Sequence, residues 1–239
     1  KKIQIDFKNF LDAEFESAKS YKPNKADWLD GTWSGFKTAS LDERKGKTSV
    51  NEDILRSIGD QIHKIPDNFN IHKRIKKIFN DRLQSIHDGK NIDWATAEAL
   101  AFATLLNEGY GVRLSGQEVG RGTFSQRHAV LYDQENENRF VPLRHFTKEQ
   151  GLFEIVDSFL SEYGVLGFEY GFSQTDPKTL VLWEAQFGDF SNGAQTIIDQ
   201  FITTGERKWL RMSGMTLLLP HGHEGQGPEH TSSRLERFL

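Results

Sequence analysis

Apolar side chains recur every three or four residues along the first 88 residues, which is the spacing of amphipathic helices. Three such helices are predicted, near residues 6–19, 54–62 and 71–86. Pro23 and Pro66 would end the first two helices, and Gly89 is placed to close the third. Residues 1–88 are therefore predicted to form a helical linker region that leads into a second domain.

From Asp93 onward, short apolar runs alternate with helical spacing. Asp93 is predicted to cap a helix that Gly109 ends, and Ser191 to cap a later helix that runs to Gly205. Four apolar runs are interpreted as buried strands: Val112–Leu114, Ala129–Tyr132, Leu180–Trp183 and Met215–Leu219. This alternation predicts an α/β fold for residues 89–239, with a parallel sheet flanked by helices.

Ligands of such sheets gather at the carboxyl ends of the strands. The loops 115–128, 184–191 and 220–230 all follow predicted strands, so a site is expected where these three loops meet.

Polar and glycine residues interrupt the apolar pattern between Ser161 and Phe201. Four carboxylates lie there among aromatic and aliphatic side chains: Glu162, Glu169, Glu184 and Asp189. A carboxylate taken out of water beside aromatic rings is costly unless it is paired or protonated, so such positions often serve chemistry. The alternative is that these acids lie on the solvent face of a helix and a loop, and spacing alone leaves both interpretations open.

Composition narrows the classes of partner. The chain has 239 residues, a net charge of -4 and a pI near 6.1, so it lacks the general basic field that attracts nucleic acid or anionic membranes. A basic cluster at residues 72–77 could bind phosphate, but without interleaved aromatic residues it is interpreted as a solvated helix face. No run of about 18 apolar residues exists. The absence of cysteine excludes disulfides, thiolate nucleophiles and cysteine zinc sites.

The segment PHGHEGQGPEH, residues 220–230, is rich in histidine and glycine. His221, His223 and His230, with Glu224, could be imagined as a metal site. The glycine-rich spacing matches no helix or hairpin geometry that would bring these side chains together, so no metal ligand is assigned.

Three passages carry a resemblance to a known family: SEYGVLGFEYG, LWEAQFGDFSNGAQ and LLPHGHEGQGPEH. They resemble the pyrimidine-binding domain of the thiamine-diphosphate-dependent decarboxylating component of 2-oxoglutarate dehydrogenase complexes. The resemblance runs from about Asp93 to Leu239 and implies a transketolase-like pyrimidine-binding domain, C-terminally incomplete. We expect both ends of the chain to be cut from a longer polypeptide.

The resemblance also implies roles for particular residues. The family pattern E-x-G-x-x-G places on Glu162 the carboxylate that hydrogen-bonds the cofactor's pyrimidine nitrogen and pushes its aminopyrimidine into the imino form. Phe187 and Phe190 match the family's aromatic pair, with Phe190 the first candidate for stacking on the pyrimidine. The final E-H-[ST]-S motif places on His230 a hydrogen bond to the substrate or the covalent intermediate.

Two of these assignments have structural alternatives. Glu118, in the loop SGQEVGRGTFSQRH, is carried over as a contact near the pyrimidine end, and the alternative for this loop is an arginine–glutamate network that stiffens a subunit interface. A capping box is the alternative for Glu162, although Gly164 and Gly167 would be poor choices for an ordinary helix interior. His221 is expected to orient its loop, and His223 receives no role.

The implied reaction is oxidative decarboxylation of 2-oxoglutarate, a citric acid cycle step, with transfer of the succinyl group to a lipoyl-bearing acyltransferase partner. Thiamine enzymes hold the diphosphate through Mg²⁺ on a second domain marked by Gly-Asp-Gly and later paired asparagines, and the chain contains no such pair. The chain alone is therefore expected to be an incomplete catalytic unit, with its site completed across a homodimer interface.

Two alternatives to this function stay open: a 2-oxoadipate dehydrogenase component and a non-catalytic assembly module of the same fold. The joint presence of Glu162, Phe190 and His230 argues against the module. We expect a cytoplasmic location in a bacterium and a mitochondrial-matrix location in a eukaryote, with neither a nucleic-acid nor a membrane partner.

Overall fold

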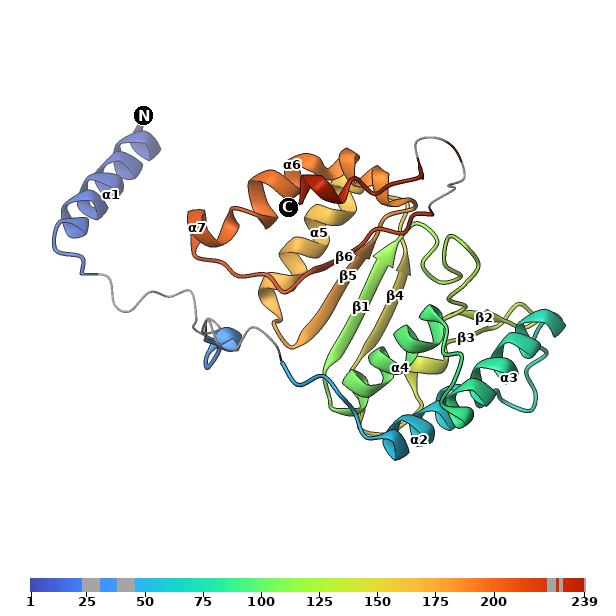
Figure 1. Ribbon diagram of the computed structural model, residues 1–239. Helices are drawn as coiled ribbons and strands as arrows, with labels where there is room; N and C mark the ends of the chain where they lie inside the picture. The colour runs from blue at the N-terminus through green and yellow to red at the C-terminus, as the bar shows by residue number, and fades with distance from the viewer. Residues whose placement is uncertain (23–30, 38–45, 223–226, 228–229, 239) are drawn as a thin grey trace. The chain divides into compact units, whose positions relative to one another are not determined.

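The computed structural model describes residues 1–22, 31–37, 46–222, 227 and 230–238 (Figure 1). Contacts divide the chain into two compact units, Lys1–Thr38 and Ala39–Leu239. The first unit contains helix α1 (Lys2–Ala18), which confirms the first predicted helix, and a 3-10 helix, η2 (Gly31–Trp33).

Four parallel strands form the central sheet of the second unit, in the order β4-β1-β5-β6. Their bounds are Gly111–Gly116 for β1, Phe153–Asp157 for β4, Thr179–Glu184 for β5 and Thr216–Leu218 for β6. Neighbouring residues of β5 serve different cores, because Leu182 packs on one side of the sheet and Trp183 on the other. A sheet buried on both faces explains the near-continuous apolar runs in the sequence and confirms the predicted α/β fold.

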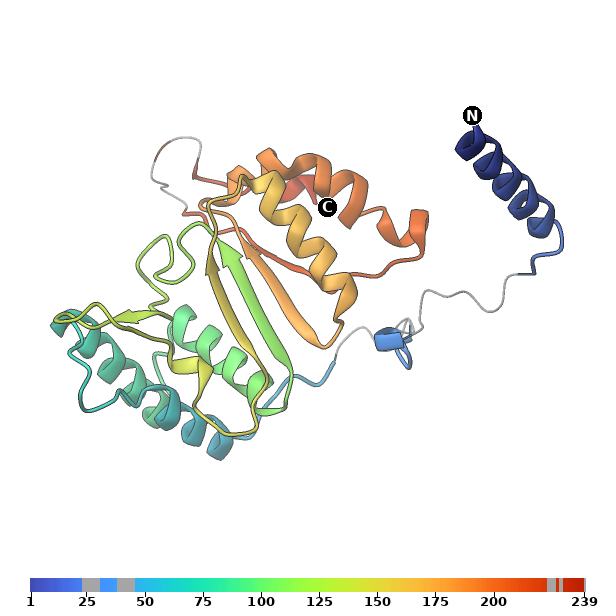
Figure 2. The ribbon, with the colours of Figure 1, turned by 180° about the vertical axis from the view of Figure 1, so that it is seen from behind.

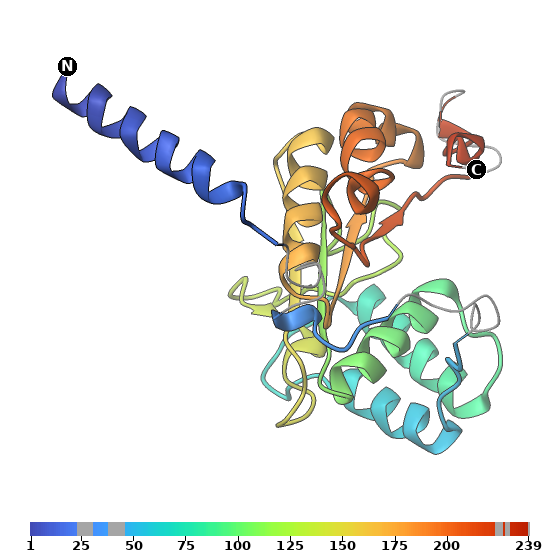
Figure 3. The same ribbon diagram turned by 90° about the vertical axis from the view of Figure 1, so that its left-hand side faces the viewer.

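Helices cover both faces of this sheet (Figures 1, 2 and 3). One layer consists of α2 (Glu52–Ile62), α3 (Lys73–Asp88) and α4 (Trp94–Asn107). The other consists of α5 (Glu162–Thr175), α6 (Gln195–Ile197) and α7 (Gly205–Trp209), together with the 3-10 helix η5 (Gly188–Ala194) and the π-helix η6 (Ile198–Ile202). Two short 3-10 helices, η4 (Pro142–Arg144) and η8 (Leu235–Arg237), complete the described elements. No helix among the described residues is both long and apolar enough to cross a membrane.

One predicted strand of the sheet is wrong and one strand was not predicted. The run predicted at residues 129–132 contributes β2 (Leu131–Tyr132), which pairs antiparallel with β3 (Arg139–Phe140) outside the parallel sheet. The strand that was not predicted is β4, which lies at the sheet edge. It buries Phe153 and Ile155, while Glu154 pairs with Arg113. Alternating burial of this kind gives a weaker sequence signal than a continuous apolar run.

Three predicted helix boundaries are confirmed and two are wrong, while Pro23 lies outside the described residues. The Asp93 carboxylate accepts a hydrogen bond from the Thr96 amide at 2.7 Å, and Gly89 closes α3 in the left-handed conformation. Gly109, also at positive φ, directly follows the C-cap of α4. Ser191, by contrast, lies buried inside η5 and caps nothing, because η5 continues directly into α6 and leaves no free helix end there. Gly205 begins α7 instead of ending a helix.

The helices α2 and α3 pack as part of the sheet-containing unit. Their residues Ile58, Ile62 and Ile86 share one buried core with Leu100 and Phe102 of α4. The predicted boundary between residues 88 and 89 lies within this unit, and as a division between domains it stays a prediction.

Gly151 is expected to tolerate no side chain, because an added Cβ would lie 2.0 Å from the Tyr110 carbonyl oxygen. Gly151→Ala should lower the free energy of unfolding by about 2–3 kcal/mol through overpacking. The control is Gly171→Ala in α5, where a Cβ meets nothing and better helix propensity should add about 0.5–1 kcal/mol. Urea denaturation measures both changes, and equal stabilities would contradict the described close approach.

Candidate active site

The four parallel strands end along one edge of the sheet, and the loop after each strand carries predicted site residues (Figure 1). Glu118 follows β1, Glu162 follows β4, Phe187 and Phe190 follow β5, and His230 follows β6. All five predicted residues therefore lie at the edge where parallel sheets bind their ligands.

Glu162 is the first residue of α5, and its side chain is half-buried. Ser161 caps the helix by accepting a hydrogen bond from the Gly164 amide at 3.4 Å. A capping box would require the acid at the position of Gly164, so Glu162 is not part of one. Gly164 and Gly167 both lie inside α5, where glycine lowers helix stability.

Two neighbours define the surroundings of the Glu162 carboxylate. Gln117, the first residue after β1, donates from Nε2 to Oε1 of Glu162 at 3.5 Å. Gly193 of η5 lies so close that a Cβ there would be 3.2 Å from Oε2 of Glu162. The carboxylate thus lies between the loops that follow β1 and β5.

Aromatic rings form a cluster beside these loops. The rings of Phe187 and His230 are stacked, with centroids 4.2 Å apart and planes inclined by 16°. Phe190 lies 5.2 Å from the His230 ring, and Phe124 contacts Phe187 edge-on at 5.8 Å. Phe190 remains 37 % exposed while Phe187 is covered by His230, so Phe190 offers the more accessible ring of the predicted pair.

His230 is paired with a buried carboxylate. Its Nδ1 lies 2.8 Å from Oδ1 of Asp189, and both side chains are largely buried. Asp189 was one of the four carboxylates noted in the apolar stretch, but no local motif predicted its contact with His230.

Glu118 links two loops at the sheet edge. One of its carboxylate oxygens, Oε2, accepts hydrogen bonds from Arg121 and from Gln186, both at 2.7 Å. A pocket of about 390 Å³ lies beside it, lined in part by Arg121, His128 and Asp157. Glu118 is thus engaged in contacts within the chain, and its role as a pyrimidine contact stays a prediction.

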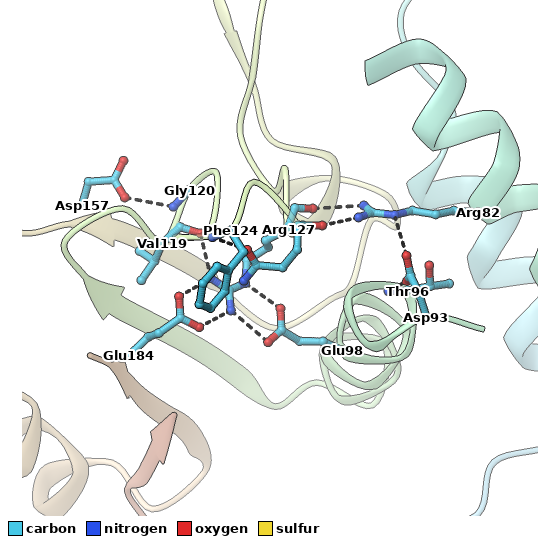
Figure 4. A network of polar contacts seen from close by, with 11 residues as sticks. Arg82, Asp93, Thr96, Glu98, Val119, Gly120, Phe124, Arg127, Asp157 and Glu184 are labelled. Carbon is cyan, nitrogen blue, oxygen red and sulfur yellow. Dashed lines mark hydrogen bonds and ion pairs between the residues drawn. The ribbon is translucent and has the colours of Figure 1, made fainter. Parts of the chain in front are cut away.

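A buried ionic network holds the loop that carries Gln117 and Glu118 (Figure 4). The Arg127 guanidinium donates to Glu98 of α4 at 2.6 and 3.0 Å. It also donates to Glu184, the last residue of β5, and to the Val119 carbonyl at 3.1 Å. Arg82 of α3 donates to the backbone carbonyls of Arg127 and Gln126. An arginine–glutamate network therefore exists in this loop, made of contacts within the chain, and its role in stiffening a subunit interface stays a prediction.

Burial acts to lower the pKa of Arg127, but hydrogen bonds from its guanidinium to Glu184 and Glu98 raise that pKa above the usual value for arginine. The guanidinium therefore stays charged, as two buried carboxylates require.

The predicted site residues at this edge of the sheet are carboxylates and aromatic rings. Among the residues that the structure describes, no three side chains of histidine, cysteine, aspartate or glutamate converge as a metal site. His223 and Glu224, two members of the metal site considered from the sequence, lie outside the described residues. His221 donates from Nδ1 to the Leu219 carbonyl oxygen of its own loop at 2.9 Å.

Sequence comparison assigns the sheet-containing part of the chain to a family. The transketolase pyrimidine-binding domain matches residues 90–239, and the chain belongs to that family. The chain is also similar over its whole length to proteins named 2-oxoglutarate dehydrogenase E1 component. It is 57% identical over 240 residues to those of Brucella canis and Brucella ovis, and 56% identical to that of Brucella melitensis biotype 2. The chain spans 24% of the length of each of these relatives.

Removing the Arg127 charge would leave two buried carboxylates without their partner. Arg127→Met is expected to lower the free energy of unfolding by about 3–5 kcal/mol. Arg121→Met removes a half-exposed pair from the same loop and should cost less than about 1 kcal/mol. Equilibrium denaturation of both variants tests this difference, and losses of equal size would contradict the structural weight given to Arg127.

Acidification should lower the free energy of unfolding through His128, which lies in the same loop as Arg127. Burial lowers the pKa of this imidazole below its usual 6.5, and the charge of Arg82 acts in the same direction. Folding therefore favours the neutral form of His128. The contribution of this preference to the free energy of unfolding is fully present above about pH 6.5, and it is lost as the pH falls through the lowered pKa of the folded state. His128→Asn, which tolerates the left-handed backbone there, should flatten the pH dependence of unfolding between pH 7.5 and 5. An unchanged pH dependence in this variant would rule out the contribution.

Proposed function

We propose that this chain forms the pyrimidine half of the thiamine diphosphate site in the decarboxylating component of a 2-oxoglutarate dehydrogenase. The observation that carries the proposal is the placement of Glu162, Phe190 and His230 at one sheet edge, from three loops separated in the sequence. The names of the relatives and the family match support the same class.

The residues fit the pyrimidine end of the cofactor. Glu162 presents a half-buried carboxylate, an acceptor for a ring N–H, at the N-terminus of α5. Phe190 presents a partly exposed ring that can stack on a flat heterocycle. We propose that the diphosphate and its Mg²⁺ are held by another part of the protein.

Thiamine diphosphate, when bound, would supply a nucleophilic carbon for the 2-oxo group and a thiazolium ring able to take up the electron pair released by decarboxylation. In this proposal Glu162 accepts a hydrogen bond from the pyrimidine ring and so holds a proton there. Gln117, which donates to Oε1 at 3.5 Å, helps to orient the Glu162 carboxylate. Phe190 packs against the pyrimidine face and excludes water, and His230 hydrogen-bonds the substrate.

The surface around Glu162 supports completion of the site by a second protein surface. Phe159, Leu160 and Tyr163 flank Glu162 in the sequence and are 104%, 55% and 51% exposed. Grouped apolar exposure of this kind commonly marks an interaction surface. We propose that the other half of the site covers it across a homodimer, and that the acyl group passes to a lipoyl-bearing acyltransferase.

The test is Glu162→Gln in the full polypeptide that contains this chain. The amide keeps the shape of the side chain but loses the negative charge, so 2-oxoglutarate-dependent carbon dioxide release should fall by roughly 100-fold or more. Glu206→Gln, an exposed acid in α7, is the matched control and should retain wild-type rates. A wild-type protein that binds no thiamine diphosphate and releases no carbon dioxide would overturn the proposal in favour of an assembly module.

A further inference from the structure

The pair formed by Asp189 and His230 has the features of a positioning device. Nδ1 of His230 lies 2.8 Å from Oδ1 of Asp189, and the exposed fractions of the two side chains are 12% and 6%. A carboxylate so deeply buried needs a donor, since an unpaired charge in a low-dielectric interior is costly. An ionised carboxylate can only accept, so the proton of this hydrogen bond belongs to Nδ1 of the imidazole.

The backbone is built to bring these two segments together. Gly188 precedes Asp189, and a Cβ on it would lie 2.5 Å from Cβ of Ser233 and 2.8 Å from the Leu219 carbonyl oxygen. Its amide donates to the Pro220 carbonyl at 2.7 Å. Only glycine allows this approach, and the approach places Asp189 against the segment that carries His230.

Aromatic packing fixes the remaining freedom of the imidazole. Phe187 is stacked on the His230 ring at 4.2 Å, and Phe190 meets the ring at 5.2 Å with an inclination of 59°. The two phenylalanine rings offer no hydrogen-bonding group that competes with Asp189 for Nδ1. The ring is therefore held in one plane by packing and in one orientation by Asp189.

We propose that Asp189 is a positioning residue that keeps a proton on Nδ1 of His230 and so directs Nε2 of the ring toward the substrate. This inference deepens the proposed function and rests on it for the identity of the substrate. Because the oxygens of a 2-oxo acid only accept hydrogen bonds, the imidazole serves it in the doubly protonated form: a proton taken up from solvent at Nε2 is donated to a carboxylate or keto oxygen of the substrate, while the Asp189 carboxylate accepts from Nδ1. Asp189 itself does not touch the substrate.

The tautomer can be read without any catalytic activity. Long-range 1H–15N spectra of the chain labelled in its eight histidine rings distinguish protonation at Nδ1 from protonation at Nε2. His230→Gln identifies the His230 signals. We expect the Nδ1–H pattern for His230 in the wild type and the Nε2–H pattern, or a mixture, in Asp189→Asn, because an amide can donate to Nδ1. A wild-type His230 with its proton on Nε2 alone would overturn the inference.

The kinetic test uses the full polypeptide with thiamine diphosphate, Mg²⁺ and 2-oxoglutarate. Asp189→Asn should lower kcat/KM by roughly 100-fold, the lower end of what a positioned proton-transfer group contributes. Its affinity for thiamine diphosphate should stay within about twofold, since Asp189 acts on His230 alone. Asp199→Asn, an exposed acid of η6, is the matched control and should leave kcat/KM unchanged.

A double-mutant cycle separates positioning from a general structural effect. If Asp189 acts through His230, Asp189→Asn should cost less than about threefold when His230 is already glutamine. A loss of equal size in both backgrounds, or no loss in the wild-type background, would overturn the inference.

Folding failure is also decisive. Should Asp189→Asn fail to fold, Asp189→Glu keeps an acceptor-only carboxylate and is expected to recover the Nδ1–H pattern and at least a tenth of kcat/KM. If neither variant folds, Asp189 is a structural requirement and the inference is wrong. If the wild type shows no turnover of 2-oxoglutarate, the proposed function fails, while the spectra still decide the tautomer of His230.

Discussion

The arrangement of the site depends on one guanidinium group buried between two carboxylates. Arg127 joins Glu98 on α4 to Glu184 at the end of β5, and all three side chains are largely buried. Moving the loop that carries Arg127 would leave these charges unpaired in a low-dielectric interior, at a cost of roughly several kcal/mol. The loop from Gln117 to His128 therefore has one well-defined position relative to the sheet, and the contacts of Gln117 and Glu118 follow from it.

Through this network the helical region also supports the loop that carries Arg127. Arg82 of α3 donates to two backbone carbonyls of the Arg127 loop, and its own charge faces Asp93 at 4.0 Å. Those carbonyls would otherwise be buried without donors, which costs about 1–3 kcal/mol each. Because α3 shares the core of α2 and α4, packing in the helical layer is coupled to the backbone of the loop at the sheet edge.

The sequence was sufficient for the fold class, because the buried strand β5 contains a continuous apolar run and the caps at Asp93 and Gly89 have unambiguous chemistry. It was insufficient where structure depends on partners distant in the sequence. The edge strand β4 shows its pattern only once Glu154 is seen to pair with Arg113, and Ser191 is a good cap residue in a place without a helix end.

The same limit applies to the site. Local motifs placed Glu162, Phe190 and His230 at one edge, but the partners of these residues come from other loops. Asp189 and His230 are separated by 41 positions, and Gln117 and Glu162 by 45. No local spacing reports contacts of that range, since they are created by the order of the strands in the sheet.

Glycine explains how four loops can converge on so small an area. A Cβ on Gly116 would lie 2.4 Å from the Glu184 carbonyl oxygen, so the ends of β1 and β5 can come together only without a side chain there. Gly188 plays the same part between the loops after β5 and β6. A larger residue at either position would separate the loops and pull apart the pairs that cross between them. The glycines of this edge thus determine which side chains meet, and the buried charges behind it keep them together.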